Sequence, residues 1–150
     1  MSRTNLLDVN VLIALLWPAH AHHQAAQRWF AMRRKSRWAT CPLTQLAFVR
    51  IVSNPDFSSE ALTPRNAMTL LRENLTNSQH EFWPDALSLE DDAFESPKPL
   101  GGHKQLTDLY LLTLASRQES GRLASFDGGL AQFASEARLD IVELVPTDIH

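Results

Sequence analysis

The sequence predicts an α/β fold, arranged as a three-layer α/β/α sandwich around a mostly parallel central sheet of four to five strands. Short apolar runs typical of strands alternate with amphipathic helical patterns along the whole chain. Such alternation favours a parallel sheet whose crossover helices cover both faces. With 150 residues, of which 44% are hydrophobic and 21% charged, the chain has the size and composition of one domain spanning residues 1–150.

The first predicted strand ends at a carboxylate. Leu6 and Leu7 form a short apolar run, Asp8 follows, and an apolar helical pattern covers residues 9–16. In open α/β sheets, ligands bind at the carboxyl ends of the strands, so Asp8 stands where a site would be built. An ionised carboxylate between leucine and valine needs a hydrogen bond, an ion pair or a cation. Asp is also a common helix N-cap, and that purely structural interpretation stays open here.

The remaining elements follow from apolar spacing and from the proline and glycine residues that bound them. Residues 96–102 are rich in both and are predicted as loop. The predicted helices cover residues 9–16, 22–34, 42–53, 64–75, 104–119 and 128–137, with a helix start in 88–95, and the predicted strands cover residues 6–7, 37–40, 81–83, 122–126 and 140–144.

Two further aspartates occupy positions that resemble that of Asp8. Asp108 lies near the start of the predicted helix 104–119, whose leucines surround its axis almost completely and predict a buried helix. Asp127 ends the predicted strand 122–126. Because that helix leads into that strand, we expect all three carboxylates to converge on one edge of the sheet. The ordinary alternatives are a helix-start acid for Asp108 and a turn residue before glycine for Asp127.

Three carboxylates brought together repel one another unless divalent cations neutralise them. Oxygen ligands without cysteine suit Mg²⁺ or Mn²⁺, which bind phosphate oxygens and activate water for phosphodiester hydrolysis. Thr44 and Gln45 follow the second predicted strand and are expected to point toward the same edge. This chemistry favours a metal-dependent nuclease.

Composition excludes several other classes. The single Cys41 excludes an intrachain disulfide framework, and the longest wholly apolar run, residues 11–17, is far shorter than the ~20 residues of a membrane-spanning helix. We therefore expect a cytoplasmic protein, although residues 3–21 also allow a secretory signal interrupted by Asp8 and Asn10. The net charge of −3 is uninformative, but basic residues gather within residues 33–37, either as a solvated helix end or as a phosphate contact.

Three short motifs each contain one of the aspartates. They are Leu7-Asp8-Val9-Asn10, Thr107-Asp108 and Ser125-Phe126-Asp127, accompanied by Trp17-Pro18, Cys41-Pro42-Leu43-Thr44 and the segment 102–108. In this order and spacing the chain resembles the PIN-domain ribonucleases over nearly its whole length. It is most similar to the VapC toxins of bacterial toxin–antitoxin pairs. The resemblance implies a PIN-like fold and a Mg²⁺-dependent endoribonuclease that acts as a toxin.

The resemblance also implies roles for individual residues. Asp8 and Asp108 would be the principal Mg²⁺ (or Mn²⁺) ligands, Asp127 would complete the catalytic acidic cluster, and Asn10 would hold the Asp8 carboxylate. Family members commonly carry glutamate where this chain has Gln45, so one negative charge is missing and Gln45 is at most a weak ligand. Candidate RNA contacts are His103, Lys104 and Arg50. The implied partners are RNA, a cognate antitoxin protein and a second copy of the chain, with no membrane.

Other interpretations stay open. Gln45 motivates an inactive PIN-like module that binds RNA or an antitoxin without cutting. Asp8 as a nucleophile would suggest a haloacid-dehalogenase-like phosphatase, but that class needs a second aspartate where Asn10 stands. Histidines 20, 22 and 23 suggest zinc or merely a solvated helix start. The aromatic residues Trp17, Trp29, Phe30 and Trp38 are expected to form core or a groove for a partner.

Overall fold

A five-stranded, all-parallel sheet forms the centre of the molecule. The computed structural model describes residues 3–95 and 102–147. Within them the strand order is β3-β2-β1-β4-β5, which confirms the predicted parallel sheet. The strands are β1 (Thr4–Leu7), β2 (Trp38–Thr40), β3 (His80–Phe82), β4 (Gly121–Ser125) and β5 (Val142–Leu144).

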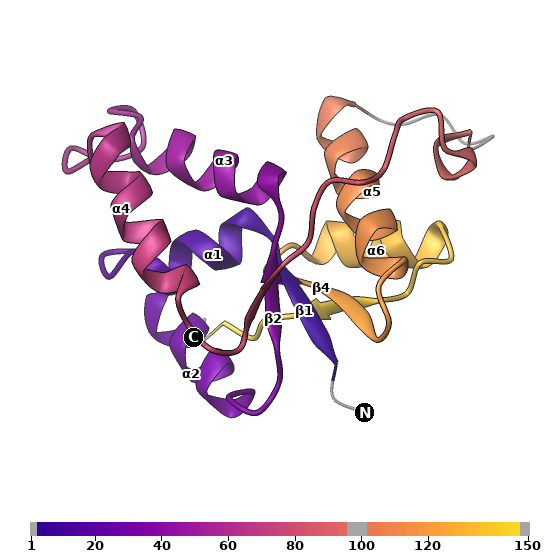
Figure 1. Cartoon of the computed structure of the whole chain (residues 1–150), viewed down its shortest axis with the longest axis horizontal. Helices are drawn as coiled ribbons and strands as arrows, with labels where there is room; N and C mark the ends of the chain where they lie inside the picture. The colour runs from indigo at the N-terminus through magenta and orange to yellow at the C-terminus, as the bar shows by residue number, and fades with distance from the viewer. Residues whose placement is uncertain (1–2, 96–101, 148–150) are drawn as a thin grey trace.

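Helices cover both faces of this sheet and complete the three layers (Figure 1). The helices α1 to α4 lie on one side, and α5 and α6 lie on the other. The helices are α1 (Val9–Leu16), α2 (His23–Met32), α3 (Pro42–Val52), α4 (Pro64–Leu75), α5 (His103–Ser116) and α6 (Gly128–Glu136). Among the described residues, no helix is long and apolar enough to cross a membrane.

Two apolar cores result from the alternation of side chains along the strands. Leu7 and Trp38 face the core shared with α1 to α4. Leu6 and Ala39 face the core shared with α5 and α6. Adjacent residues of one strand therefore bind the two helical layers to the same sheet.

Local signals in the sequence account for the helix starts. Thr63 caps α4 by accepting a hydrogen bond from the backbone N–H of Asn66, and Pro64 follows at the first helical position. Pro42 occupies the same position in α3, where a missing N–H costs nothing. The predicted boundaries of these helices agree with the structure.

One prediction about a helix was wrong. Residues 88–95 contain no α-helix but only a 3₁₀ turn, Asp92–Phe94. Its capping residue, Asp91, accepts a hydrogen bond from the Arg117 side chain. The prediction that α5 is a buried helix holds for its second half, because residue 109 and residues 111–115 are at most 5% exposed and lie on all sides of the helix. Leu106, nearer the start of α5, is 37% exposed.

Candidate active site at the carboxyl edge of the sheet

Asp8 and Asp127 lie at the same edge of the sheet. The strands β1 and β4 are parallel neighbours with Leu7 opposite Ala124, so the residues that follow both strands meet at their carboxyl ends. Asp8 is half-buried there, and its Oδ1 accepts a hydrogen bond from the backbone N–H of Val9 at 2.8 Å. Asp8 therefore is the N-cap of α1, but its other oxygen takes part in a second set of contacts.

Ser125 joins the polar groups of this edge. Its side chain is fully buried, and its hydroxyl donates a hydrogen bond to Asp8 Oδ2 at 2.8 Å. The Ser125 hydroxyl oxygen itself accepts hydrogen bonds from Asn10 Nδ2 at 3.2 Å and from the backbone N–H of Asp127 at 3.1 Å. One donor and two acceptor positions are all that a hydroxyl has, so Ser125 is fully used. Ser125 thereby fixes the Asp8 carboxylate relative to the start of the loop that carries Asp127.

Asn10 acts on Asp8 through Ser125. Its Nδ2 bonds to the Ser125 hydroxyl, and its Oδ1 accepts a long hydrogen bond of 3.4 Å from the backbone N–H of Phe126. Asn10 was predicted to hold the Asp8 carboxylate, and the role of Ser125 was not predicted. The signals for Ser125 in the sequence were its place in the motif Ser125-Phe126-Asp127 and its small polar side chain after the apolar pair Leu123 and Ala124.

Asp127 is also a helix cap. Its Oδ1 accepts hydrogen bonds from the backbone N–H groups of Gly129 at 2.9 Å and Leu130 at 3.3 Å, which open α6. The side chain is half-buried. Asp127 therefore does have the structural role of a turn residue before glycine. The two capping hydrogen bonds hold its carboxylate in place, two residues beyond Ser125.

Asp108 lies on the second turn of α5 and is half-buried. Helix α5 ends shortly before β4 begins, so it runs antiparallel to that strand and its first half extends toward the carboxyl edge (Figure 1). His103 and Lys104 open α5, and their side chains lie outside the described part of the structure. Arg50 is exposed near the end of α3, away from the first turn of that helix.

Gln45 lies in the first turn of α3 and is tied to the last residue of β2. Its Nε2 donates a hydrogen bond to Thr40 Oγ1 at 3.0 Å. The Thr40 hydroxyl also lies 2.8 Å from Nε2 of His80. Thr44, expected at the same edge, instead turns inward: it is buried, and its hydroxyl bonds to the backbone of Cys41.

The residues expected to hold a metal offer only oxygen ligands, which suit Mg²⁺ or Mn²⁺. These residues are Asp8, Asp108, Asp127 and Gln45. Within residues 3–95 and 102–147, no three His, Cys, Asp or Glu side chains are gathered so that they could hold a metal ion. Mg²⁺ is commonly bound by one or two carboxylates and several waters, so a site for it does not require three gathered side chains.

The histidines 20, 22 and 23 make local contacts instead of a zinc site. His20 Nδ1 accepts the backbone N–H of His22 at 3.0 Å, and His23 Nδ1 lies 2.8 Å from the carbonyl oxygen of Ala14. The His22 ring packs on Phe126 with centroids 5.3 Å apart. These contacts support the interpretation as a helix start.

The basic residues 33–37 lie at the opposite edge of the sheet, because β2 begins directly after them. Arg33 pairs with Glu143 and lies over the Trp29 ring at 5.0 Å. Arg37 pairs with Glu81 at 2.5 Å. These pairs support a structural role for Arg33 and Arg37 and place both away from the Asp8 edge.

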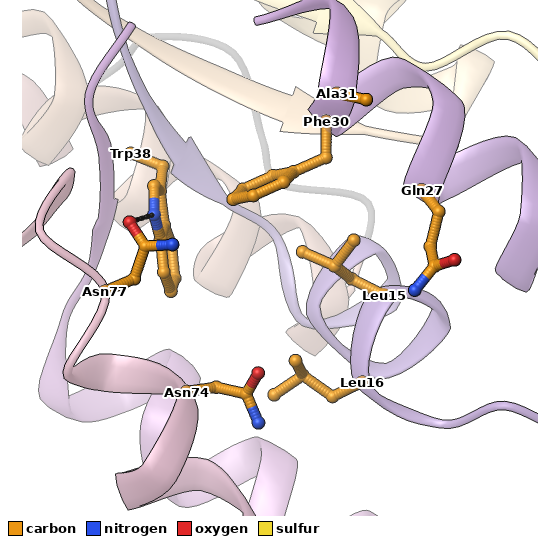
Figure 2. Close-up of a pocket in the computed structure, with 8 residues that line it drawn as sticks. All are labelled: Leu15, Leu16, Gln27, Phe30, Ala31, Trp38, Asn74 and Asn77. Atoms are coloured by element: carbon orange, nitrogen blue, oxygen red, sulfur yellow. Dashed lines mark hydrogen bonds between the residues drawn. The ribbon is translucent and has the colours of Figure 1, made fainter. Parts of the chain in front are cut away.

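A cavity of about 360 Å³ also lies on the amino side of the sheet (Figure 2). Phe30 and Trp38 contribute aromatic walls, and the amide side chains of Gln27, Asn74 and Asn77 line it as well. Trp17, Trp29 and Trp38 are at most 9% exposed, which confirms that these tryptophans belong to the core. The cavity is separate from the carboxyl edge, because Trp38 is the first residue of β2.

Comparison with known proteins agrees with this architecture. The PIN domain model matches residues 6–136. The chain is 42% identical over 139 residues to Ribonuclease VapC39 of Mycobacterium tuberculosis, covering 93% of this chain and 99% of that protein. From the same organism, Ribonuclease VapC29 is 42% identical over 146 residues (96% and 98% covered), and Ribonuclease VapC38 is 40% identical over 140 residues (93% and 96% covered). The match over most of its length shows that this chain belongs to the PIN-domain family.

Proposed function

We propose that this protein is a metal-dependent endoribonuclease and the toxin of a toxin–antitoxin pair. The observation that carries the proposal is the Ser125 hydroxyl, which holds Asp8 and the backbone of Asp127 together at the carboxyl edge of a PIN-domain sheet. The relatives that it resembles at 40–42% identity are named ribonucleases. We expect the same class of substrate here.

Each residue of the edge has a distinct part in this proposal. Asp8 and Asp108 would hold Mg²⁺ or Mn²⁺, which when bound supplies charge neutralisation and an activated water at the scissile phosphodiester. Asp127 would complete the acidic cluster, with its carboxylate oriented by the two N–H groups of α6. Ser125 and Asn10 keep Asp8 in one orientation, so no rearrangement is needed when substrate arrives.

Candidate RNA contacts are His103, Lys104 and Arg50. Lys and Arg carry positive charge and His can donate a hydrogen bond, so all three suit phosphate oxygens, which supply most of the sequence-independent affinity for nucleic acid. We also expect an antitoxin to cover the protein, with the cavity between α1, α2 and α4 as a candidate contact (Figure 2). A homodimer and a cytoplasmic location complete the proposal, since the RNA substrate is found there.

The test is cleavage of a labelled single-stranded RNA pool by purified protein. We expect cleavage with Mg²⁺, loss of cleavage with EDTA, and recovery when Mg²⁺ or Mn²⁺ is added back. Asp8→Asn and Asp108→Asn should each lower the rate at least 100-fold. Asp140→Asn, the same change at an exposed position before β5, is the matched control and should retain the wild-type rate. Full activity in both Asp8→Asn and Asp108→Asn would refute the proposal.

A second candidate is a PIN-like module that binds RNA or an antitoxin without cutting. The neutral Gln45 side chain favours it, because one negative charge is missing from the expected ligand set. Comparing wild type with Gln45→Glu, in Mg²⁺ and in EDTA, separates the two functions. Cleavage by wild type supports the nuclease, whereas RNA binding without cleavage, with activity only in Gln45→Glu, supports the binding module.

A further inference from the structure

A chain of hydrogen bonds runs from His80 of β3 to the Gln45 side chain. Thr40, the last residue of β2, is fully buried, and its hydroxyl contacts Nε2 of His80 at 2.8 Å and Nε2 of Gln45 at 3.0 Å. The series His80, Thr40 and Gln45 thus links β3, β2 and α3.

The direction of this chain follows from the Gln45 end. The amide nitrogen of Gln45 can only donate, so the Thr40 oxygen accepts from it. The Thr40 hydroxyl has one proton, and it points to His80 Nε2, which accepts. A neutral His80 ring then carries its single proton on Nδ1.

We propose that Thr40 and His80 are positioning residues that orient the Gln45 amide, with its nitrogen toward β2 and its carbonyl oxygen Oε1 available as a neutral metal ligand. This inference rests on the proposed metal-dependent function. Without the directed chain, the amide nitrogen and oxygen of Gln45 would be free to exchange places. Half of the orientations would then present N–H groups, which repel a cation.

The chain also distinguishes glutamine from glutamate at this position. A carboxylate has no proton to donate, so Thr40 would have to turn its hydroxyl proton toward residue 45. His80 Nε2 would then lose its donor and would itself need a proton to bond to Thr40. Thr40 and His80 thus match an amide, and Gln45 is a coherent part of its surroundings rather than a defect.

The first test reads the His80 tautomer directly. Long-range ¹H–¹⁵N NMR spectra at pH 7.5, with His80→Gln used to assign the signal among the six histidines, should show a protonated Nδ1 and an unprotonated Nε2. In Gln45→Glu, the proton should appear on Nε2. A protonated Nε2 in the wild type, or an Nε2 that remains unprotonated in Gln45→Glu, would overturn the proposed direction of the chain.

The second test measures binding of Mg²⁺ by calorimetry without RNA. Thr40→Val keeps the shape of the side chain and removes the hydroxyl, and we expect Mg²⁺ affinity to fall about 10-fold, as is typical for the loss of a group that orients a ligand. Thr40→Ser restores the hydroxyl and should restore the affinity. Unchanged affinity in Thr40→Val, or no recovery in Thr40→Ser, would overturn the inference.

Asp8→Asn separates the failure of this inference from the failure of the proposed function. If the wild type does not bind Mg²⁺, or if Asp8→Asn binds as well as the wild type, the proposed metal site itself is wrong. If Asp8→Asn abolishes binding while Thr40→Val leaves it intact, the metal site stands and only the role of Thr40 is refuted. Circular dichroism of Thr40→Val checks its fold, and the wild-type tautomer tests the chain without any change at Thr40.

Discussion

Replacing Ser125 by alanine should have an unusually large effect for the loss of one hydroxyl group. The change removes a hydrogen bond to the charged carboxylate of Asp8, which contributes roughly 1.5–3 kcal/mol. It also leaves Asn10 Nδ2 and the backbone N–H of Asp127 without their acceptor. Each of these neutral bonds contributes about 1 kcal/mol, and water entering at the edge offsets part of the total. We expect a net loss of about 2–4 kcal/mol, or roughly 6–12 °C in Tm at the midpoint of that range.

The assay is urea unfolding monitored by circular dichroism, with Ser53→Ala as the matched control. The Ser53 hydroxyl makes one neutral hydrogen bond, to the carbonyl oxygen of Val49 at 2.6 Å, so its loss should cost only about 0.5–1.5 kcal/mol. Ser125→Ala should also cleave RNA more slowly, because the Asp8 carboxylate loses its orienting donor. If the two alanine variants unfold with the same free energy, Ser125 does not join the polar groups of the edge as described.

Three further predictions concern backbone packing and titration. Gly121→Ala should destabilise the fold by about 1–3 kcal/mol in urea unfolding, because the new Cβ would lie 2.2 Å from a backbone carbonyl oxygen at the end of α5. Gly128→Ala is the control, because its new Cβ would meet nothing within 4 Å, and it should be neutral or slightly stabilising. Hydrogen bonds from Arg117 lower the pKa of Asp91 to about 2. The contribution of this carboxylate to stability is therefore complete above about pH 4 and is lost as the pH falls through 2. An NMR titration should show this pKa rising toward 3.8 in Arg117→Gln, and an unchanged value would contradict the pairing. Burial lowers the pKa of His80, so the unfolded chain takes up a proton that the folded chain does not, and stability should fall as the pH drops below about 6.5. Between pH 7.5 and 5.5, the free energy of urea unfolding should fall less in His80→Gln than in the wild type, and an equal fall would refute the assignment.

The fold class was predictable because its signals are local. Apolar periodicity, the proline at the first position of α3 and α4, and the Thr63 cap are each contained within a few residues, and they fix the order of strands and helices. The place of Asp8 was predictable for the same reason, since it directly follows a strand. Residues 88–95 were mispredicted as a helix start because the acidic pattern is typical of a first helical turn, but Asp91 bonds to Arg117, 26 positions away.

What only the tertiary structure decided is how the polar groups are paired. Ser125 and Asp8 are 117 positions apart, and Thr40 and His80 are 40 positions apart, yet each pair lies within hydrogen-bond distance. Sheet register brings them together, and register depends on the packing of whole strands against two helical layers rather than on any short segment. The sequence alone therefore predicts which residues follow the strands at this edge. The orientation of each carboxylate and amide there depends on residues that are distant in the sequence.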